Sequence, residues 1–207
     1  ALLLNWYRYR IALKLGIPNF KPVILFRSKT IEDSKADCEK FIALCKSVTA
    51  SDFNFIHNLS KMNMPADDPI PSLYTVNGNI FAQILLYLKE NEYSFENVAA
   101  YIRENFQERT TIITNSKTNT TKKEKTDSEI DRLLNSLEDY DNHVRAIFTV
   151  QRLTEGWDVL NLYDIVRLYT GRDTDTKTHK AGASTTSEVQ LIGRGVRYYP
   201  FVHNDMP

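Results

Sequence analysis

The feature that most constrains the fold of this chain is a continuous apolar run, Val-Ile-Leu-Phe, at residues 23–26. A strand with one wet face alternates apolar and polar residues, so a run that is apolar throughout is typical of a strand buried on both faces. A polar loop at 27–30 and apolar residues at helical spacing over 31–48 follow this run. Strand, polar loop and helix in this order begin a βαβ unit, which predicts a parallel sheet.

The same alternation continues along the chain and predicts an α/β fold, a parallel sheet flanked by helices. Helical periodicity is present over residues 2–15, 80–90, 95–106 and 130–137, with Thr126 and Asp127 as capping residues for the last helix. Apolar and β-branched runs predict further strands at 110–114, 145–150 and 164–169. Residues 50–78 lose periodicity, so we predict an irregular stretch there and a helical insertion over 50–108 as a whole.

Composition predicts one globular domain over residues 1–207, because 42% hydrophobic and 11% aromatic residues can bury a full core. The 26 basic residues balance the 26 acidic residues, so a phosphate contact has to come from a local cluster of charge. No apolar run approaches the ~20 residues of a membrane span, and charged residues soon interrupt the opening Ala-Leu-Leu-Leu. We therefore predict a soluble, cytoplasmic protein.

The two cysteines, Cys38 and Cys45, are seven residues apart in a helical pattern that also contains Phe41 and Ile42. Two turns of helix place both thiols on one face beside these apolar side chains, which favours a buried core over a metal site. A pair of this kind gives no disulfide framework and fits a reducing compartment. We expect no bound metal.

Ligands of open parallel sheets collect beyond the carboxyl ends of the strands, and three segments near such ends carry chemical groups. In the first, Gln190, Arg194 and Arg197 lie at helical positions i, i+4 and i+7, so an amide and two guanidiniums share one face. Gly193 and Gly195 cost about 1 kcal/mol each inside a helix, which makes sense where a ligand or a facing domain approaches closely. Guanidiniums suit a transferring phosphoryl group, although a helix end with two solvated arginines remains the alternative.

The other two segments follow strands. Gly156 permits a tight turn after the strand at 145–150, and Asp158 can accept a hydrogen bond from a ribose hydroxyl or a facing arginine. Arg27, Ser28 and Lys29 follow the strand at 23–26 and can present amides and side chains to phosphates. A plain connection between strand and helix, capped by a threonine, is the alternative for this loop.

These segments resemble a known family. Leu-Phe-Arg-Ser at 25–28, Glu-Gly-Trp-Asp-Val at 155–159 and Gln-Leu-Ile-Gly-Arg-Gly-Val-Arg at 190–197 are similar, in order, to motifs IV, V and VI of superfamily two helicases. The similarity is closest to the Res subunit of type III restriction–modification enzymes, and residues 127–139 and 161–168 extend it beyond the helicase motifs. The resemblance implies a RecA-like fold and the role of second motor domain in a DNA-dependent ATPase.

The resemblance also implies roles for single residues. Arg194 and Arg197 would reach the γ-phosphate of ATP held by a preceding motor domain, while Gln190 contacts the nucleotide or its attacking water. The remaining implied roles are nucleotide binding for Gly156, Asp158 and Gly193, and DNA backbone contacts for Arg27, Ser28 and Lys29. Val150-Gln151 departs from the Thr-Asp found in many of these helicases, which leaves the usual threonine contact to DNA to Thr149 or Thr154.

The implied cofactors are ATP and Mg²⁺, bound mainly by the first domain, and the implied partners are duplex DNA, that domain and a DNA methyltransferase subunit. The sequence has no Gly-x-x-x-x-Gly-Lys-Ser/Thr loop and no convincing nuclease centre. We therefore expect a piece of a longer protein that is inactive alone, with any DNA cleavage performed elsewhere. A DNA repair helicase of the same superfamily and a non-catalytic α/β binding module for nucleic acid or protein remain the alternatives.

Overall fold

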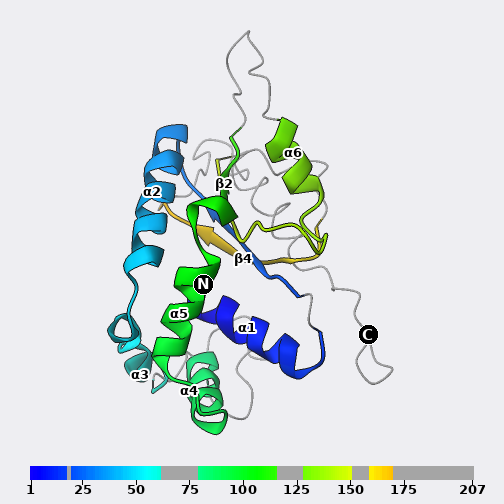
Figure 1. Ribbon diagram of the computed structural model, residues 1–207. Coiled ribbons are helices and arrows are strands. Elements are labelled where there is room, and N and C mark those ends of the chain that lie inside the picture. The colour runs from blue at the N-terminus through cyan, green and yellow to red at the C-terminus, as the bar shows by residue number, and fades with distance from the viewer. Residues whose placement is uncertain (18–19, 62–78, 116–127, 151–158, 170–207) are drawn as a thin grey trace, which may run out of the picture.

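The strands form one parallel sheet, as the sequence predicts. The computed structural model describes residues 1–17, 20–61, 79–115, 128–150 and 159–169. The four strands of the described part are β1 (Val23–Arg27), β2 (Thr111–Ile113), β3 (Ala146–Thr149) and β4 (Leu162–Arg167). They lie in the order β2-β3-β1-β4, and every pair of neighbours is parallel (Figure 1). The α/β, RecA-like fold class is confirmed.

Alternate residues of the central strands face two separate cores. Ile24 and Phe26 of β1 belong to one core together with Phe148 of β3, and the rings of Phe26 and Phe148 stack at 4.7 Å. Val23 and Leu25 belong to the other core. All five residues of β1 are buried, which is why the run at 23–26 shows no polar alternation. The sheet is therefore covered on both faces.

Helices α1 (Leu2–Lys14) and α2 (Ile31–Ser47) contribute to the first core. Thr30 caps α2 by accepting a hydrogen bond at 3.1 Å from the backbone nitrogen of Asp33. Helix α1 is followed by Gly16, whose φ of 76° is a conformation that favours glycine. Both helices lie within one residue of the bounds predicted from periodicity.

Cys38 and Cys45 of α2 are free thiols in the first core, so the predicted core position is confirmed. Burial is the main cause that raises the pKa of Cys38 to about 11, and it raises the pKa of Cys45 to about 12. Both thiols are therefore held in the neutral form at physiological pH.

The segment 50–108 carries helices that share this same core with the sheet. They are η1 (Ala50–Phe53), α3 (Ile56–Leu59), α4 (Ile80–Glu90), α5 (Phe95–Asn105) and η3 (Glu108–Thr110). Ile84 of α4 and Ile102 of α5 are fully buried in the first core. Periodicity predicted α4 and α5 but not η1 and α3, because a helix of four residues is too short to show a repeat of 3.6.

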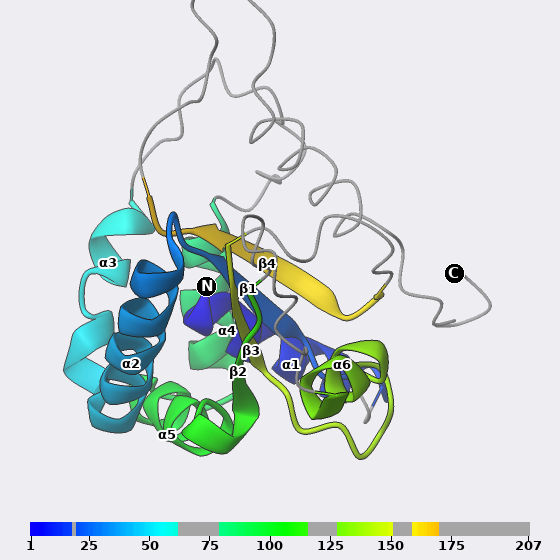
Figure 2. The ribbon, with the colours of Figure 1, turned by 90° about the horizontal axis from the view of Figure 1, so that it is seen from above.

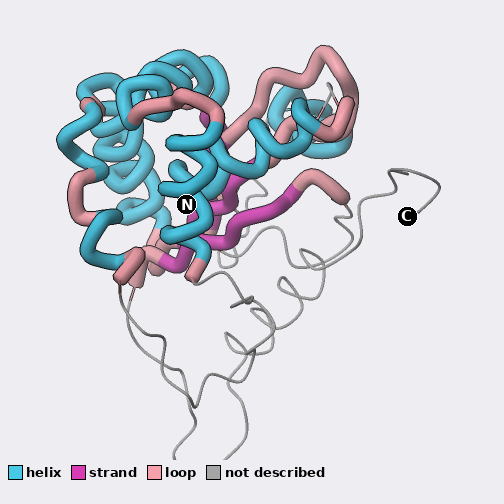
Figure 3. Tube along the Cα trace, turned by 90° about the horizontal axis from the view of Figure 1, so that it is seen from below, coloured by secondary structure: helices cyan, strands magenta, loops and turns pink. Residues whose placement is uncertain are grey.

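Helix α6 (Ser128–Asn135) covers the opposite face of the sheet (Figure 2). Periodicity predicted this helix through Leu137, but it ends at Asn135 and Leu137 is buried in the loop that follows. The amide of Asn142 donates to the carbonyl oxygen of Leu133 at 2.8 Å and so satisfies one of the last carbonyls of the helix. The capping residues predicted at 126 and 127 lie outside the described residues. Figure 3 shows the strands running along one side of the large group of helices.

Candidate functional site

The carboxyl ends of β1 and β3 lie side by side. Arg27 of β1 is in register with Thr149 of β3, and the backbone nitrogen of Ser28 donates to the carbonyl oxygen of Thr149 at 3.0 Å. β4 ends at the same edge, since the backbone nitrogen of Leu168, directly after β4, donates to the carbonyl oxygen of Arg27 at 2.9 Å. The loops that follow these strands therefore leave from one edge of the sheet, which is where parallel sheets bind ligands.

Arg27 is almost completely buried, with 3% of the residue exposed. Its Nε donates a hydrogen bond to the carbonyl oxygen of Val150 at 3.2 Å. A buried guanidinium requires such acceptors, because its desolvation is costly. Arg27 thus connects the loop after β1 to the first residue beyond β3.

Ser28 is also buried, and its side chain is directed at helix α2. The Oγ of Ser28 donates to a carboxylate oxygen of Asp37 at 2.7 Å, and Thr30 caps the start of the same helix. These two bonds fix the loop between β1 and α2. Lys29, between them, is exposed, so it is the member of the predicted trio whose charge faces water. Contact of these three residues with DNA stays a prediction.

Two buried threonines lie at this edge: Thr149 ends β3, and Thr114 directly follows β2. Thr114 and Thr149 are 1% and 2% exposed, and within the described part of the chain neither hydroxyl oxygen has a hydrogen-bond partner. Beside them, the side-chain oxygen of Asn115 accepts a hydrogen bond from the backbone nitrogen of Val150 at 3.1 Å. Thr149 is one of the two candidates for the threonine that contacts DNA. It is in register with Arg27 of the neighbouring strand.

The structure adds residues that the sequence did not single out. Asp37 orients Ser28, and Asn115 orients Val150, so both support residues of the predicted site. Asp37 looked like one more polar residue on a helix, and Asn115 like the start of a polar loop. A signal for Asn115 existed, since an asparagine directly after a strand often bonds to nearby backbone.

The other predicted site residues lie outside the described residues. They are Thr154, Gly156, Asp158, Gln190, Gly193, Arg194 and Arg197. Within the described ranges, no group of three histidine, cysteine, aspartate or glutamate side chains could hold a metal ion. None of the helices in those ranges is both long and apolar enough to cross a bilayer.

Comparison with known proteins gives three related chains and one family model. The chain is 48% identical over 190 residues to the probable type III restriction-modification enzyme HindVIP Res subunit of Haemophilus influenzae, which covers 92% of this chain and 36% of that protein. It is 36% identical over 85 residues to the EcoPI Res subunit of Escherichia phage P1 and, equally, to the EcoP15I Res subunit of Escherichia coli, both type III restriction-modification enzymes.

Each of the last two matches covers 40% of this chain and 8% of the relative. The chain thus spans about a third of the length of the Haemophilus relative. A family model described as HI_1054_N, N-terminal region, matches residues 184–206. No solved structure matches the chain significantly.

Proposed function

Because the chain is homologous to a Res subunit of a type III restriction-modification enzyme over 92% of its length, we propose that it is part of a restriction enzyme subunit. Within that subunit we assign it the role of second motor domain of a DNA-dependent ATPase. In this role it supplies arginine side chains to an ATP site that is built mainly by a preceding domain.

The observation that carries this proposal is that the strands preceding two motif-bearing segments are neighbours in the sheet. Residues 25–28 end β1, and the segment 155–159 follows β3, its hydrogen-bonded neighbour in the sheet. The bond from Arg27 to the carbonyl of Val150 joins the end of β1 to the residue directly after β3. A motor domain needs this link, since the DNA contact of one loop has to respond to the nucleotide sensed by the other.

The proposed division of labour follows the groups present. Arg194 and Arg197 stabilise charge on the γ-phosphate, and Gln190 contacts the nucleotide or the attacking water. The other assigned roles are nucleotide binding by Gly156, Asp158 and Gly193, and contact with the DNA backbone by Lys29, Arg27, Ser28 and Thr149 or Thr154. ATP with Mg²⁺ would supply the phosphoryl-transfer chemistry, held mainly by the preceding domain. A DNA methyltransferase subunit and duplex DNA are the proposed partners, in the cytoplasm.

The decisive experiment measures steady-state ATP hydrolysis by the full-length protein with and without duplex DNA. Arg194→Ala and Arg197→Ala are compared with the wild type and with Arg109→Ala, a change at an exposed arginine on η3. Loss of turnover by ~10³-fold or more with nucleotide binding retained is expected for both fingers. Turnover within a few-fold of wild type would leave a non-catalytic binding module as the better assignment.

A second measurement separates the restriction enzyme from a repair helicase of the same superfamily. The full-length protein is purified with and without its co-expressed DNA methyltransferase, and DNA cleavage is followed in the presence of ATP. Cleavage that requires both the methyltransferase and ATP is the expected result. ATP-driven unwinding without cleavage and without any association with a methyltransferase would favour the repair helicase.

A further inference from the structure

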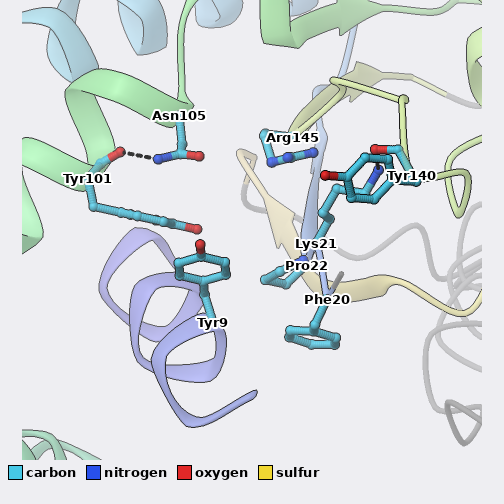
Figure 4. A pocket seen from close by; sticks show the side chains of 8 residues that line it. All are labelled: Tyr9, Phe20, Lys21, Pro22, Tyr101, Asn105, Tyr140 and Arg145. Atoms are coloured by element: carbon cyan, nitrogen blue, oxygen red, sulfur yellow. Dashed lines mark hydrogen bonds between the residues drawn. The ribbon is translucent and has the colours of Figure 1, made fainter. Parts of the chain in front are cut away.

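A pocket of about 300 Å³ opens near the beginnings of β1 and β3, at the edge of the sheet opposite to the proposed motor site. Its volume is at the lower end of the range for pockets that bind small molecules. Polar and aromatic side chains from four separate segments surround it (Figure 4). Those used below are Tyr9, Lys21, Tyr101, Asn105, Tyr140 and Arg145.

Arg145 is the central charged group of this pocket. Its guanidinium is half-buried, and one terminal nitrogen donates to the carbonyl oxygen of Val144 at 2.9 Å. Among the described residues, no carboxylate lies within ion-pair distance of Arg145, and its other nitrogens donate no hydrogen bond. Burial lowers the pKa of Arg145, and the groups that oppose this effect are the phenols of Tyr101 and Tyr9. The positive charge therefore has no anionic partner in the described part of the protein.

Lys21 adds a second positive charge with a different role. Its Nζ donates to the carbonyl oxygens of Tyr140 and Asn142, each at 2.9 Å, and to that of Asp139. Three acceptors use all three hydrogens of an ammonium group, so Lys21 fixes the loop at 139–142 and contributes charge without a free donor. Burial and then Arg145 lower the pKa of Lys21, while Asp141 and Asp139 each oppose this by less.

The uncharged groups are arranged to leave a donor and an acceptor facing the pocket. The amide nitrogen of Asn105 donates to the carbonyl of Tyr101 at 2.9 Å, which directs its amide oxygen toward Arg145 (Figure 4). The hydroxyl of Tyr101 is used by Asn5, to which it donates at 3.0 Å. The hydroxyl of Tyr9 makes no hydrogen bond to any described residue, although its ring packs 5.3 Å from that of Tyr101. Tyr9 is therefore a donor without a partner among the described residues, and it lines the same pocket as Arg145.

We propose that this pocket binds a phosphate monoester, with Arg145 as the principal ligand and Tyr9 as a second donor. A guanidinium with unused donors binds two oxygens of a phosphate side by side. The tetrahedral shape of phosphate offers a third oxygen out of that plane, where a phenol can donate. The roughly −1.5 to −2 charge of a phosphate monoester at neutral pH matches the combined charge of Arg145 and Lys21, whereas a carboxylate carries less.

Two sources can supply such a group, a free mononucleotide and the 5′-terminal phosphate of a nucleic acid strand. A pocket of this volume admits a single nucleotide unit and excludes a duplex, so an internal stretch of double-stranded DNA is not the ligand. The site lies away from Arg27 and Thr149, and the proposal does not depend on the motor assignment. It predicts a second phosphate-binding position on the same domain.

The test follows thermal unfolding of the full-length protein at constant ionic strength as ligand is added. The ligands are inorganic phosphate, adenosine monophosphate, and one single-stranded oligonucleotide with and without a 5′-phosphate. Arg145→Gln is compared with the wild type and with Arg109→Gln. Stabilisation by phosphate ligands is expected to need at least tenfold more ligand in Arg145→Gln and to be unchanged in Arg109→Gln.

The oligonucleotide pair identifies the source. Stronger stabilisation by the 5′-phosphorylated strand than by the unphosphorylated one identifies the end of a strand as the ligand. Equal stabilisation by both strands, together with stabilisation by adenosine monophosphate, identifies a free nucleotide as the ligand. Equal stabilisation of the wild type and Arg145→Gln would overturn the proposal, as would stabilisation by glutamate but not by phosphate. If Arg145→Gln does not fold, Tyr9→Phe replaces it. Several-fold weaker phosphate binding by that variant supports the site, and unchanged binding overturns it.

Discussion

The side chain of Arg27 donates a hydrogen bond to the backbone carbonyl of Val150 and thereby crosses from the end of one strand to the end of its neighbour. Arg27→Met removes this donor while keeping the aliphatic stem. We expect loss of about 1–3 kcal/mol of stability, because the part-buried carbonyl of Val150 loses its donor. In the full-length protein we also expect weaker stimulation of ATP hydrolysis by DNA. Denaturant unfolding and DNA-stimulated turnover measure the two effects, and a variant with both unchanged would contradict a linking role for Arg27.

Lys29 provides the matched comparison, since it lies two residues further on and is exposed. Lys29→Ala is expected to leave thermal stability within ~0.5 kcal/mol of wild type, as for most surface changes. If Lys29 contacts a DNA phosphate, the slope of log affinity against log salt falls by about one. Titration of duplex DNA at several salt concentrations gives this slope, and an unchanged slope removes Lys29 from the DNA interface.

The cap of α2 holds the same loop from its other end. Thr30→Ala removes the oxygen that accepts from the nitrogen of Asp33, and we expect a loss of about 1 kcal/mol. Thr30→Ser keeps the oxygen and should retain most of that stability. Urea denaturation of the three proteins measures the difference. Equal midpoints for the alanine and serine variants would show that the cap contributes little.

The two cysteines predict a loss of stability at alkaline pH. Their pKa values of about 11 and about 12 in the folded state exceed the ordinary value of 9.0, so the folded protein holds these protons more tightly than the unfolded chain. Stability therefore falls as pH rises above about 9, where unfolded thiols ionise and folded thiols do not. Unfolding of wild type and Cys45→Ser between pH 7 and 10 is the test, and the serine variant should show a shallower pH dependence.

Alkylation gives an independent check on the same thiols. The thiolate is the reactive form, and both groups are buried and neutral in the folded state. At pH 8 we expect iodoacetamide to modify the native protein at least tenfold more slowly than the urea-unfolded chain. Mass spectrometry measures the extent of modification with time. Rapid labelling of the native protein would mean that α2 opens readily or that the thiols are accessible.

Local patterns predicted most of the fold because their physical causes are local. The apolar run at 23–26 lies in β1. This strand has a neighbour on each side in the sheet, which explains why all of its residues are buried. Helix α6 was predicted too long because Leu137 continues the apolar spacing, although it packs from a loop. The spacing records which residues face the core, but it does not record the bond from Asn142, outside the helix, to the carbonyl of Leu133 near the helix end.

The site was predicted less completely because its contacts join distant residues. The loop at 27–29 was identified from its composition, but burial of Arg27 and Ser28 follows from neighbours at Val150 and Asp37. Nothing in the local sequence distinguishes a buried arginine after a strand from an exposed one. The pocket around Arg145 was not predicted at all, since its lining comes from separate segments that the fold brings together.

The position of β1 in the sheet has a consequence for synthesis of the protein. Both hydrogen-bonded neighbours of β1 lie more than a hundred residues later in the chain, since Ile24 pairs with Ala146 and with Asp164. During translation this apolar strand emerges before either of its partners and stays unpaired until they follow. Long-range pairing of this kind slows folding and leaves strand edges exposed to aggregation. The nascent chain is therefore expected to depend on chaperones until β3 and β4 have left the ribosome.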